Sequence, residues 1–324
     1  MVWSETALEE LGGRRALITG GASGLGYETA AVLARRGARV LIADRNIEGG
    51  VEALRRLRAA NPGADISFKA LDLADLAQIR AFAADLVEAG QPLDILVNNA
   101  GITPPLARRT TADGFELKFG INYLGHFALT GLLLPLLLHA KRPRVVTVSS
   151  IAHRQGHIHF DDLQLERHYD PQRAYNQTKL ACLLFALELQ RRCDAAHLNL
   201  MSIAAHPGVA RTSLPASRKG QKRQRFTDYL VDIILPLTMT LLGQSAERGA
   251  RPIIHAAAAA GVVGGGFYGP DGFGEMKGDP APAKASAEAK DPAVGSRLWA
   301  ASVALTGVDY GELDQARLAD AAPR

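Results

Sequence analysis

The segment Tyr175-Asn-Gln-Thr-Lys179 places a phenol and an ammonium four residues apart. If the segment is helical, the two side chains share one helix face, and the Lys179 ammonium can lie beneath the Tyr175 hydroxyl. A cation at that place favours the charged phenolate, which makes a tyrosine usable as an acid and base near neutral pH. Such a pair is common and usually structural, so its meaning depends on the motifs around it.

A glycine-rich turn lies near the amino end of the chain, in Thr19-Gly-Gly-Ala-Ser-Gly-Leu-Gly26. Apolar patterning predicts a buried strand before it and a helix after it. A phosphate needs bare backbone N–H groups at the start of a helix, and Gly20, Gly24 and Gly26 keep that approach open. The alternative is a tight strand-to-helix turn without a ligand, but the acid discussed next favours a dinucleotide site.

That acid is Asp44, eighteen positions beyond Gly26 and directly after a second expected strand. A carboxylate there accepts hydrogen bonds from the adenosine ribose hydroxyls and repels a 2′-phosphate. Arg45, its neighbour, can instead clamp a 2′-phosphate or lie over the adenine. The sequence therefore favours NAD as the cofactor and keeps NADP as the alternative.

The elements that must position these residues alternate along the first two-thirds of the chain. Strands are expected over 15–19, 38–43, 66–70, 93–97, 144–148 and 199–204, and helices over 26–36, 48–60, 76–89, 113–140 and 174–192. Continuous apolar strands separated by helices predict an α/β fold, with a doubly wound parallel sheet covered by helices on both faces.

Beyond residue 207 this alternation weakens. Residues 207–225 are loop-like and basic, 226–242 form an apolar helical stretch, and 247–260 an alanine-rich helix. The glycine-dense stretch 261–278 resembles turns, 281–293 a mobile loop or short helix, and 297–305 a last helix. No linker divides the chain, so we predict a single domain over residues 1–324.

Composition and charge exclude several classes of protein. The 324 residues include 37 Lys and Arg against 33 Asp and Glu, which gives a net charge of +4. Five basic residues and no acid lie in Arg218–Arg225, so the rest of the chain carries 4 − 5 = −1. Because the positive charge is confined to one loop, we expect no nucleic-acid partner.

Cysteine content and hydropathy indicate a cytoplasmic protein. Cys182 and Cys193 are too few for a disulfide scaffold and lack the spacing of a metal site. The amino terminus is acidic where a signal peptide is basic, and no apolar run approaches the ~20 residues of a membrane span. We therefore expect no integral membrane segment.

Further motifs follow in a fixed order: Asn98-Asn-Ala-Gly101 after the fourth strand, Ser149-Ser150 after the fifth, and His206-Pro-Gly208 with Thr212 after the sixth. With the glycine turn and YNQTK they make the chain resemble the short-chain dehydrogenase/reductases over residues 14–270. The glycine spacing of four then two resembles the dehydrogenase members. VVTVSSIAHRQGHIHFDDLQ and YGPDGFGEM look most like the retinol dehydrogenase-like subgroup.

The resemblance implies a short-chain alcohol dehydrogenase or carbonyl reductase of Rossmann-type fold. Tyr175 would be the general acid/base, and Lys179 would favour its charged form and hold the nicotinamide ribose. Ser150 would donate a hydrogen bond to the substrate oxygen, with Ser149 as a structural neighbour. Asn122 matches the residue whose backbone holds a relay water. The alternative is a non-catalytic redox sensor of the same fold, but such relatives typically lose the Tyr or the Lys.

The resemblance also assigns residues to the dinucleotide. They are Gly20, Ser23, Gly24, Leu25 and Gly26 at the pyrophosphate, Asp44 and Arg45 at the adenosine ribose, Asp72 and Leu73 at the adenine edge, Asn99, Ala100 and Gly101 beside the ribose, Tyr175 and Lys179, and Pro207, Val209 and Thr212 along the carboxamide. Asp44 departs from NADP-using members of the subgroup, which tend to have an uncharged residue there. The 25 residues between Ser150 and Tyr175 must form a loop beside the site.

The same comparison divides the domain into a core over 14–210, a substrate lid over 211–246 and C-terminal helices and loops over 247–324. The apolar stretch of the lid suggests a hydrophobic small-molecule substrate, although a helix covering the sheet would look the same. The run Leu129–Leu138 suits pairing in a dimer or tetramer, or burial in the chain's own core.

No metal site is expected. Imidazoles bind zinc, but we interpret four histidines as parts of a solvated loop: His153, His157, His159 and His168. We interpret His126 and His206 as structural residues.

Overall fold

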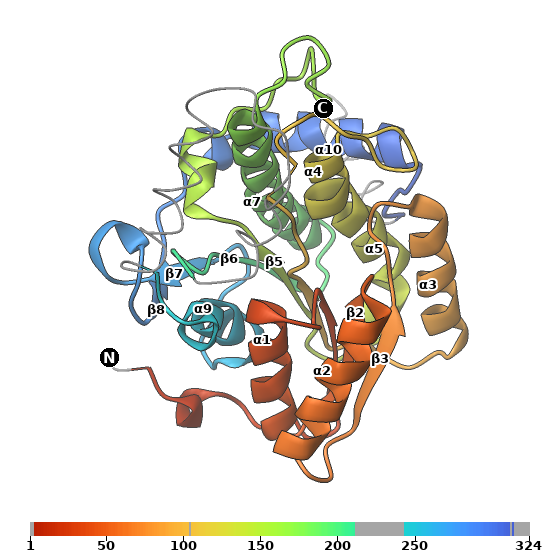
Figure 1. Cartoon of the computed structure of the whole chain (residues 1–324), viewed down its shortest axis with the longest axis vertical. Helices are drawn as coiled ribbons and strands as arrows, with labels where there is room; N and C mark the ends of the chain where they lie inside the picture. Colours follow the sequence, from red (N-terminus) through yellow and green to blue (C-terminus); the bar gives the residue numbers. More distant parts are fainter. Residues whose placement is uncertain (1–2, 104, 211–242, 312, 314–324) are drawn as a thin grey trace.

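The computed structural model of the chain describes residues 3–103, 105–210, 243–311 and 313. It contains eight strands: β1 (Arg15–Thr19), β2 (Arg39–Asp44), β3 (Ile66–Ala70), β4 (Ile95–Asn98), β5 (Arg144–Val148), β6 (Met201–Ala205), β7 (Phe267–Pro270) and β8 (Pro280–Pro282). They form one sheet in the order β3-β2-β1-β4-β5-β6-β7-β8, parallel except for β8 (Figure 1). The single-domain, doubly wound α/β prediction is confirmed.

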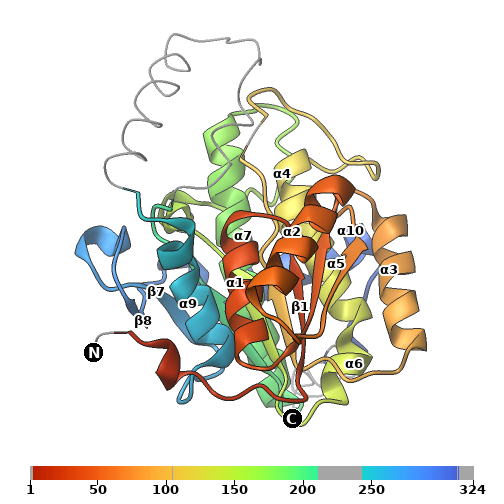
Figure 2. The ribbon, with the colours of Figure 1, turned by 60° about the horizontal axis from the view of Figure 1, so that its bottom comes forward.

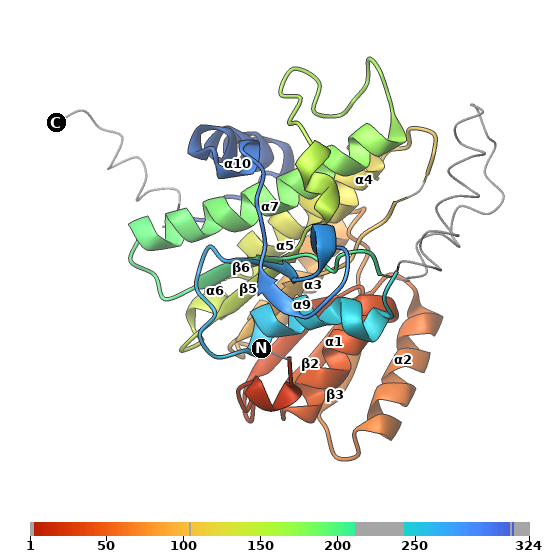
Figure 3. The same cartoon turned by 90° about the vertical axis from the view of Figure 1, so that its left-hand side faces the viewer.

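Helices cover both faces of the sheet, as the edge-on view in Figure 3 shows. One face carries α1 (Gly24–Arg35), α2 (Ile47–Ala60) and α9 (Ala246–Ala258); the other carries α3 (Leu76–Glu88), α4 (Leu117–Phe119), α5 (Gly125–Leu132), α6 (Leu134–Leu138) and α7 (Pro171–Ala195), with α10 (Pro292–Thr306) outside α7. Successive side chains of a strand point to opposite faces, so Leu17 belongs to the apolar cluster on the α7 side and Ile18 to the cluster on the α1 side. The strands are apolar on both faces because both faces are buried.

The sheet order creates a crevice at the carboxyl ends of the strands. From β1 the chain proceeds outward through β2 and β3, and then returns to the other side of β1 as β4. In open α/β sheets, ligands bind where the strand order reverses in this way. The glycine-rich turn follows β1, Asp44 ends β2 and Asn99 follows β4, so the predicted cofactor residues meet at this crevice.

The predicted helix over 113–140 is wrong as a continuous element. Residues Gly120–Leu124 form a π-helical turn between α4 and α5, and Leu133 (φ −92°, ψ 0°) separates α5 from α6. Pro135 explains the second break, since its ring suits the first turn of a helix and not a helix interior. The π-helical turn contains Asn122, a predicted site residue.

The carboxyl-terminal third also differs from the prediction. The stretch expected to be turns contains β7, and the expected loop or helix over 281–293 starts in β8 (Figure 2). Both strands are short and rich in glycine and proline, a composition that usually indicates turns. The last helix starts earlier than predicted, at Pro292, because Asp291 caps it by accepting from Ala293 N at 2.8 Å.

The leucine-rich run at 129–138 is covered largely by the chain itself. A Cβ placed on Gly131 would lie 2.7 Å from Val308 Cγ1, and Tyr310 Oη donates a 2.6 Å hydrogen bond to Phe127 O. Burial in the chain's own core accounts for most of these leucines, because Leu129, Leu133, Leu134, Leu136 and Leu137 are buried. The oligomeric state stays a prediction. In the part of the chain that the structure describes, no helix is both long and apolar enough to cross a bilayer.

Candidate active site

The glycine-rich turn needs glycine for two physical reasons. Gly20 (φ +66°) and Gly24 (φ +55°) adopt left-handed conformations that favour glycine. A Cβ on Gly26 would lie 2.2 Å from Gly20 O, so this residue lets α1 start close against β1. The helix starts at Gly24, two residues before the predicted start, with Ser23 as its N-cap. The first N–H groups of a helix have no partner within it and can bind an anion.

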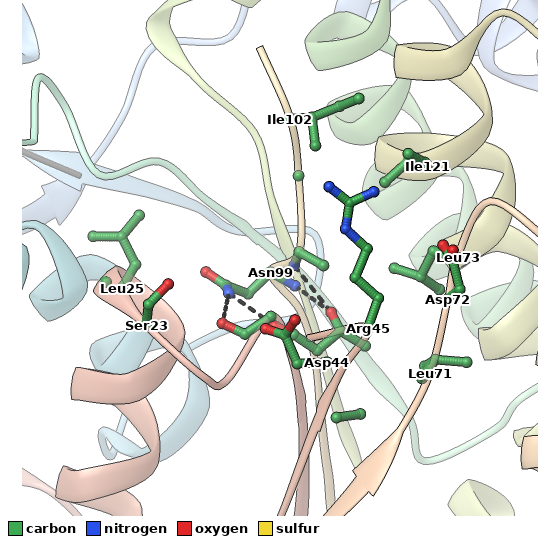
Figure 4. A pocket seen from close by; sticks show the side chains of 16 residues that line it. Ser23, Leu25, Asp44, Arg45, Leu71, Asp72, Leu73, Asn99, Ile102 and Ile121 are labelled. Atoms are coloured by element: carbon green, nitrogen blue, oxygen red, sulfur yellow. Dashed lines mark hydrogen bonds between the residues drawn. The ribbon is translucent and has the colours of Figure 1, made fainter. Parts of the chain in front are cut away.

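A cavity of about 270 Å³ opens next to this turn (Figure 4). Eleven of its lining residues are those predicted for the dinucleotide: Gly20, Ser23, Gly24, Leu25, Asp44, Arg45, Asp72, Leu73, Asn99, Ala100 and Gly101. Gly26 lies buried below it. The other five lining residues were not predicted: Thr19, Ala43, Leu71, Ile102 and Ile121. All five are chain neighbours of predicted site residues, which is the signal that could have found them.

Asp44 is held at the rim of the cavity by backbone groups on two sides. Its Oδ2 accepts from Ala22 N at 3.3 Å and its Oδ1 from Asn46 N at 3.0 Å. Figure 4 shows the Arg45 side chain extending from the end of β2 over the cavity, and this residue is exposed. The carboxylate is thus fixed by the backbone, whereas the guanidinium extends toward solvent.

Thr19 joins the ends of β1 and β4 below the cavity. Its Oγ1 accepts from both Asn99 N and Ala100 N, each at 3.0 Å, and lies 2.8 Å from His126 Nε2. The Asn99 carboxamide adds a 2.8 Å bond to Thr19 O. Burial lowers the pKa of His126 to about 4, so its ring is neutral at neutral pH. Its Nδ1–H then donates to Asn122 O at 3.0 Å, and its Nε2 accepts from Thr19.

The π-helical turn directs Asn122 at the strand extension beyond β4. The Asn122 carboxamide accepts from Ile102 N at 2.8 Å and donates to Ile102 O at 2.9 Å. Its backbone carbonyl accepts from the His126 ring and, at 3.2 Å, from Cys182 Sγ. Asn122 therefore ties the cavity wall to α5 and α7, whereas its role in holding a relay water stays a prediction.

Tyr175 and Lys179 lie one turn apart on α7, as their spacing predicted. Lys179 Nζ lies 5.9 Å from the centroid of the Tyr175 ring and donates to Val148 O at 3.0 Å. A Cβ placed on Gly101 would lie 3.7 Å from the same Nζ. The Lys179 ammonium is therefore next to the wall of the cavity.

The two adjacent serines have different partners. Ser149 is buried and its Oγ donates to Lys179 O at 2.7 Å. Ser150 is half-buried and its Oγ accepts from Ala152 N at 3.2 Å, which caps the 3₁₀ turn Ile151–Gln155. Because that bond uses only a lone pair, the Ser150 hydroxyl proton can still be donated.

The loop between Ser150 and Tyr175 is fastened to the segment around α4. Gln164 Oε1 accepts from Glu116 N at 2.7 Å, and the fully buried Lys118 ammonium donates to Tyr169 Oη at 2.6 Å. The loop between Ser150 and Tyr175 therefore packs against the α4 segment.

Of the residues predicted for the carboxamide side, Pro207 and Val209 follow β6, and Thr212 lies outside the described residues. Pro207 and Val209 do not line the cavity at the glycine turn. Val209 N donates to Met276 O at 2.7 Å, and Pro207 O accepts from Gln244 Nε2 at 2.8 Å. Most of the expected lid also lies outside the described residues.

The interpretation of the loop histidines as solvated is wrong for His153. This residue is fully buried, its Nδ1 lies 2.6 Å from Ser150 O and its ring packs against Phe267. The structural role of His126 and His206 is confirmed, since both rings are buried with partners at each nitrogen. Among the described residues, no group of three or more His, Cys, Asp or Glu side chains is placed to hold a metal ion.

Known proteins resemble this chain in sequence and in fold. Residues 14–223 match the family model of the short chain dehydrogenases. Human retinol dehydrogenase 13 is 39% identical over 300 residues, which cover 92% of this chain and 86% of that protein. Mouse polyprenol dehydrogenase is 40% identical over 308 residues, covering 93% and 86%. A crystal structure of an uncharacterized protein from Mycobacterium paratuberculosis superposes with a TM-score of 0.76 at 38% identity, covering 96% of this chain and 99% of that one.

Proposed function

The chain belongs to the short-chain dehydrogenase family and is thereby an NAD(P)-dependent oxidoreductase, and we propose that it acts on the carbonyl or alcohol carbon of a hydrophobic substrate with Tyr175 as general acid/base. The observation that carries the proposal is the position of Lys179 Nζ, which is next to Tyr175 on α7 and next to Gly101 in the wall of the cavity. The acid/base pair and the predicted dinucleotide residues thus meet at one place.

The residues around the cavity fit a dinucleotide. The open helix start at Gly24 suits the pyrophosphate, Asp44 suits the adenosine ribose hydroxyls, and Lys179 suits the nicotinamide ribose. The nicotinamide, when bound, supplies or accepts the hydride. We propose NAD as the preferred cofactor because the backbone fixes the Asp44 carboxylate where a 2′-phosphate would be repelled.

The chain's own residues handle the proton and the substrate oxygen. Tyr175 Oη gives its proton to the oxygen during carbonyl reduction and takes a proton from the alcohol during oxidation. Ser150 Oγ donates a hydrogen bond to the same oxygen while it carries developing negative charge. Lys179 lies on the same face of α7 as Tyr175, and its bond to Val148 O holds the ammonium at the carboxyl end of β5.

A hydrophobic substrate is proposed on two grounds. The first is the apolar stretch over 226–242, whose composition suits an apolar pocket wall. The second is the chemistry of the relatives, because retinol and polyprenol are both long apolar alcohols. Cytoplasmic location and homo-oligomer formation are retained as proposals from the sequence.

The test follows absorbance of the reduced nicotinamide while the protein is given decanal, a steroid ketone and a small sugar. Faster turnover of the two apolar carbonyls is expected. Equal turnover of the sugar would show that the substrate proposal is wrong. If the protein bound the cofactor but turned over nothing on a broad panel, it would be a dinucleotide sensor instead of an enzyme.

A further inference from the structure

The chain between β7 and β8, two strands that Figures 1 and 2 label, carries an acid, Glu275, that is not among the predicted catalytic residues. Glu275 (φ +58°) follows Gly274 (φ +62°), so two successive residues are left-handed. This conformation is uncommon for a residue with a side chain and persists only where the surroundings enforce it. The Glu275 side chain is only 15% exposed, so the turn directs a carboxylate inward.

The Glu275 carboxylate joins three segments that are distant in the sequence. Its Oε2 pairs with Arg154 Nη2 at 2.6 Å and accepts from His206 Nε2 at 3.0 Å. Its Oε1 accepts from Lys284 N at 3.1 Å. Both carboxylate oxygens are therefore used, and two of the partners come from the predicted catalytic region.

On the side of β6, Glu275 acts through His206. Gly208 N donates to His206 Nδ1 at 3.2 Å, so the proton of the neutral ring is on Nε2 and is donated to Glu275. Burial lowers the pKa of His206 to about 4, so the ring stays neutral at neutral pH. The carboxylate thus fixes the ring, and the ring fixes the backbone at Gly208.

The same turn touches the segment Pro207–Val209 directly. Val209 N donates to Met276 O at 2.7 Å, and a Cβ placed on Gly208 (φ +63°) would lie 2.3 Å from the same oxygen. The two backbones are in contact, so a shift of the turn must move this segment as well.

On the side of β5, Glu275 acts through Arg154. Arg154 lies in the 3₁₀ turn Ile151–Gln155, which Ser150 caps, and its Nη1 also donates to Gly274 O at 3.3 Å. The turn that presents the Ser150 hydroxyl is therefore tied to the same carboxylate as the segment after β6.

We infer that Glu275 is a positioning residue, which fixes the segment Pro207–Val209 on the nicotinamide side relative to the turn that carries Ser150. The inference rests on the proposed function, because that function places the nicotinamide between these two segments. A glutamine offers one neutral oxygen in place of two carboxylate oxygens, whereas Arg154, His206 and Lys284 N all donate to Glu275. The hydrogen bonds from Arg154 and His206 therefore lose their charge assistance and weaken.

The test compares two ligands that differ only at the nicotinamide end. The first ligand is the reduced nicotinamide dinucleotide, NADH or NADPH, that wild type binds more tightly. The second is the ADP-ribose that matches it, without a 2′-phosphate for NADH and with one for NADPH. The dissociation constants of both ligands are measured for wild type and for Glu275→Gln. Loss of one charge-assisted contact predicts a dissociation constant about 5- to 10-fold higher for the dinucleotide and a change below about 2-fold for the ADP-ribose. With a carbonyl substrate, kcat should fall while KM changes little.

Asp279→Asn is the matched control, because Asp279 lies in the same hairpin but pairs with Arg251 at 2.9 Å. It should change neither dissociation constant. Arg154→Met is the second variant. It breaks the same ion pair from the other side if Glu275→Gln does not fold, and the same selective loss of dinucleotide affinity is expected.

The inference is overturned if the variants that fold bind both ligands as wild type does, or lose affinity for both equally. Wild type that binds the dinucleotide without turnover refutes the proposed activity alone, and the binding comparison still decides the role of Glu275. Wild type that binds neither ligand refutes both.

Discussion

Ser149 Oγ donates a 2.7 Å hydrogen bond to Lys179 O, which joins the end of β5 to the helix that carries the acid/base pair. The next residue, Ser150, makes no such bond to α7 in the described structure and instead caps its own turn through Ala152 N. These two adjacent serines therefore have different roles. Ser149 joins β5 to α7, whereas we expect the Ser150 hydroxyl to donate to the substrate.

Substitution of each serine by alanine should separate these tasks. Ser150→Ala removes a donor to the developing oxyanion, so kcat should fall by about 10²- to 10³-fold with little change in unfolding free energy. Ser149→Ala removes a buried hydrogen bond to Lys179 O, which keeps its backbone partner inside α7, so the free energy of unfolding should fall by about 0.5–1.5 kcal/mol while kcat stays within a few-fold of wild type. Steady-state kinetics and urea unfolding of both variants check this. The reverse pattern would exchange the two assignments.

Gly26→Ala should disrupt the glycine turn. The new Cβ would lie 2.2 Å from Gly20 O, and neither backbone can yield without moving α1 from β1. Overpacking of this kind costs about 1–3 kcal/mol, and dinucleotide affinity should fall as well because the helix start moves. Gly12→Ala is the control, since a Cβ placed on Gly12 would have no atom within 4 Å. Equal melting temperatures and equal cofactor affinities for the two variants would contradict the packing argument.

Asp44→Ala should relax the choice of cofactor. Removing the carboxylate removes the repulsion of a 2′-phosphate, so the ratio of NADP to NAD affinity should rise at least about 10-fold, equivalent to about 1.4 kcal/mol. Asp72→Asn removes a charge from the same cavity, but Asp72 lies at the expected adenine edge, where its Oδ1 accepts from Ala74 N. It should leave that ratio unchanged. A wild type that prefers NADP would overturn the NAD proposal.

Two buried histidines should make the stability depend on pH. The pKa of His126 and of His206 is about 4, below the ordinary 6.5, because burial disfavours the charged ring. Below pH 6.5 the unfolded chain takes up protons that the folded chain does not, so the stabilisation present above pH 6.5 is lost as the pH falls toward 4. Each histidine should contribute about 1.4 kcal/mol per pH unit within this window.

His126→Gln removes one of these titrations and keeps a polar side chain. Urea unfolding at pH 7.5, 6 and 5 should therefore show a shallower loss of unfolding free energy for the variant than for wild type, whatever its stability at pH 7.5. Parallel curves for the two proteins would refute the assignment of His126 as a neutral buried ring.

The sheet up to β6 was predictable because buried parallel strands are apolar on both faces, and a run such as Arg15–Thr19 is distinct from the helical patterns beside it. That the residues predicted for the cofactor meet at one crevice was predictable because Gly20, Asp44 and Asn99 each follow or end such a strand. Local pattern and spacing carried that information. Eleven of the residues expected along the dinucleotide line one cavity for this reason.

The remainder depends on contacts between distant residues. Nothing near Glu275 in the sequence indicates His206 or Arg154, which lie 69 and 121 positions away. The last two strands, β7 and β8, have the composition of turns and become strands only by pairing with β6 and with each other. His153 is buried because Phe267, more than a hundred residues later, covers its ring. A single sequence does not reveal these pairings.

The central claim is that Tyr175 transfers the proton in a nicotinamide-dependent reaction. Its most direct test is oxidation of the reduced nicotinamide by Tyr175→Phe, with a carbonyl that wild type reduces, beside a measurement of cofactor affinity. Tyr268→Phe is the control, since the Tyr268 hydroxyl accepts from Val263 N and the residue does not line the cavity. We expect Tyr175→Phe to lose about 10²- to 10⁴-fold in kcat and to retain its cofactor affinity, while the control turns over as wild type does. Turnover by Tyr175→Phe at the wild-type rate would contradict the central claim.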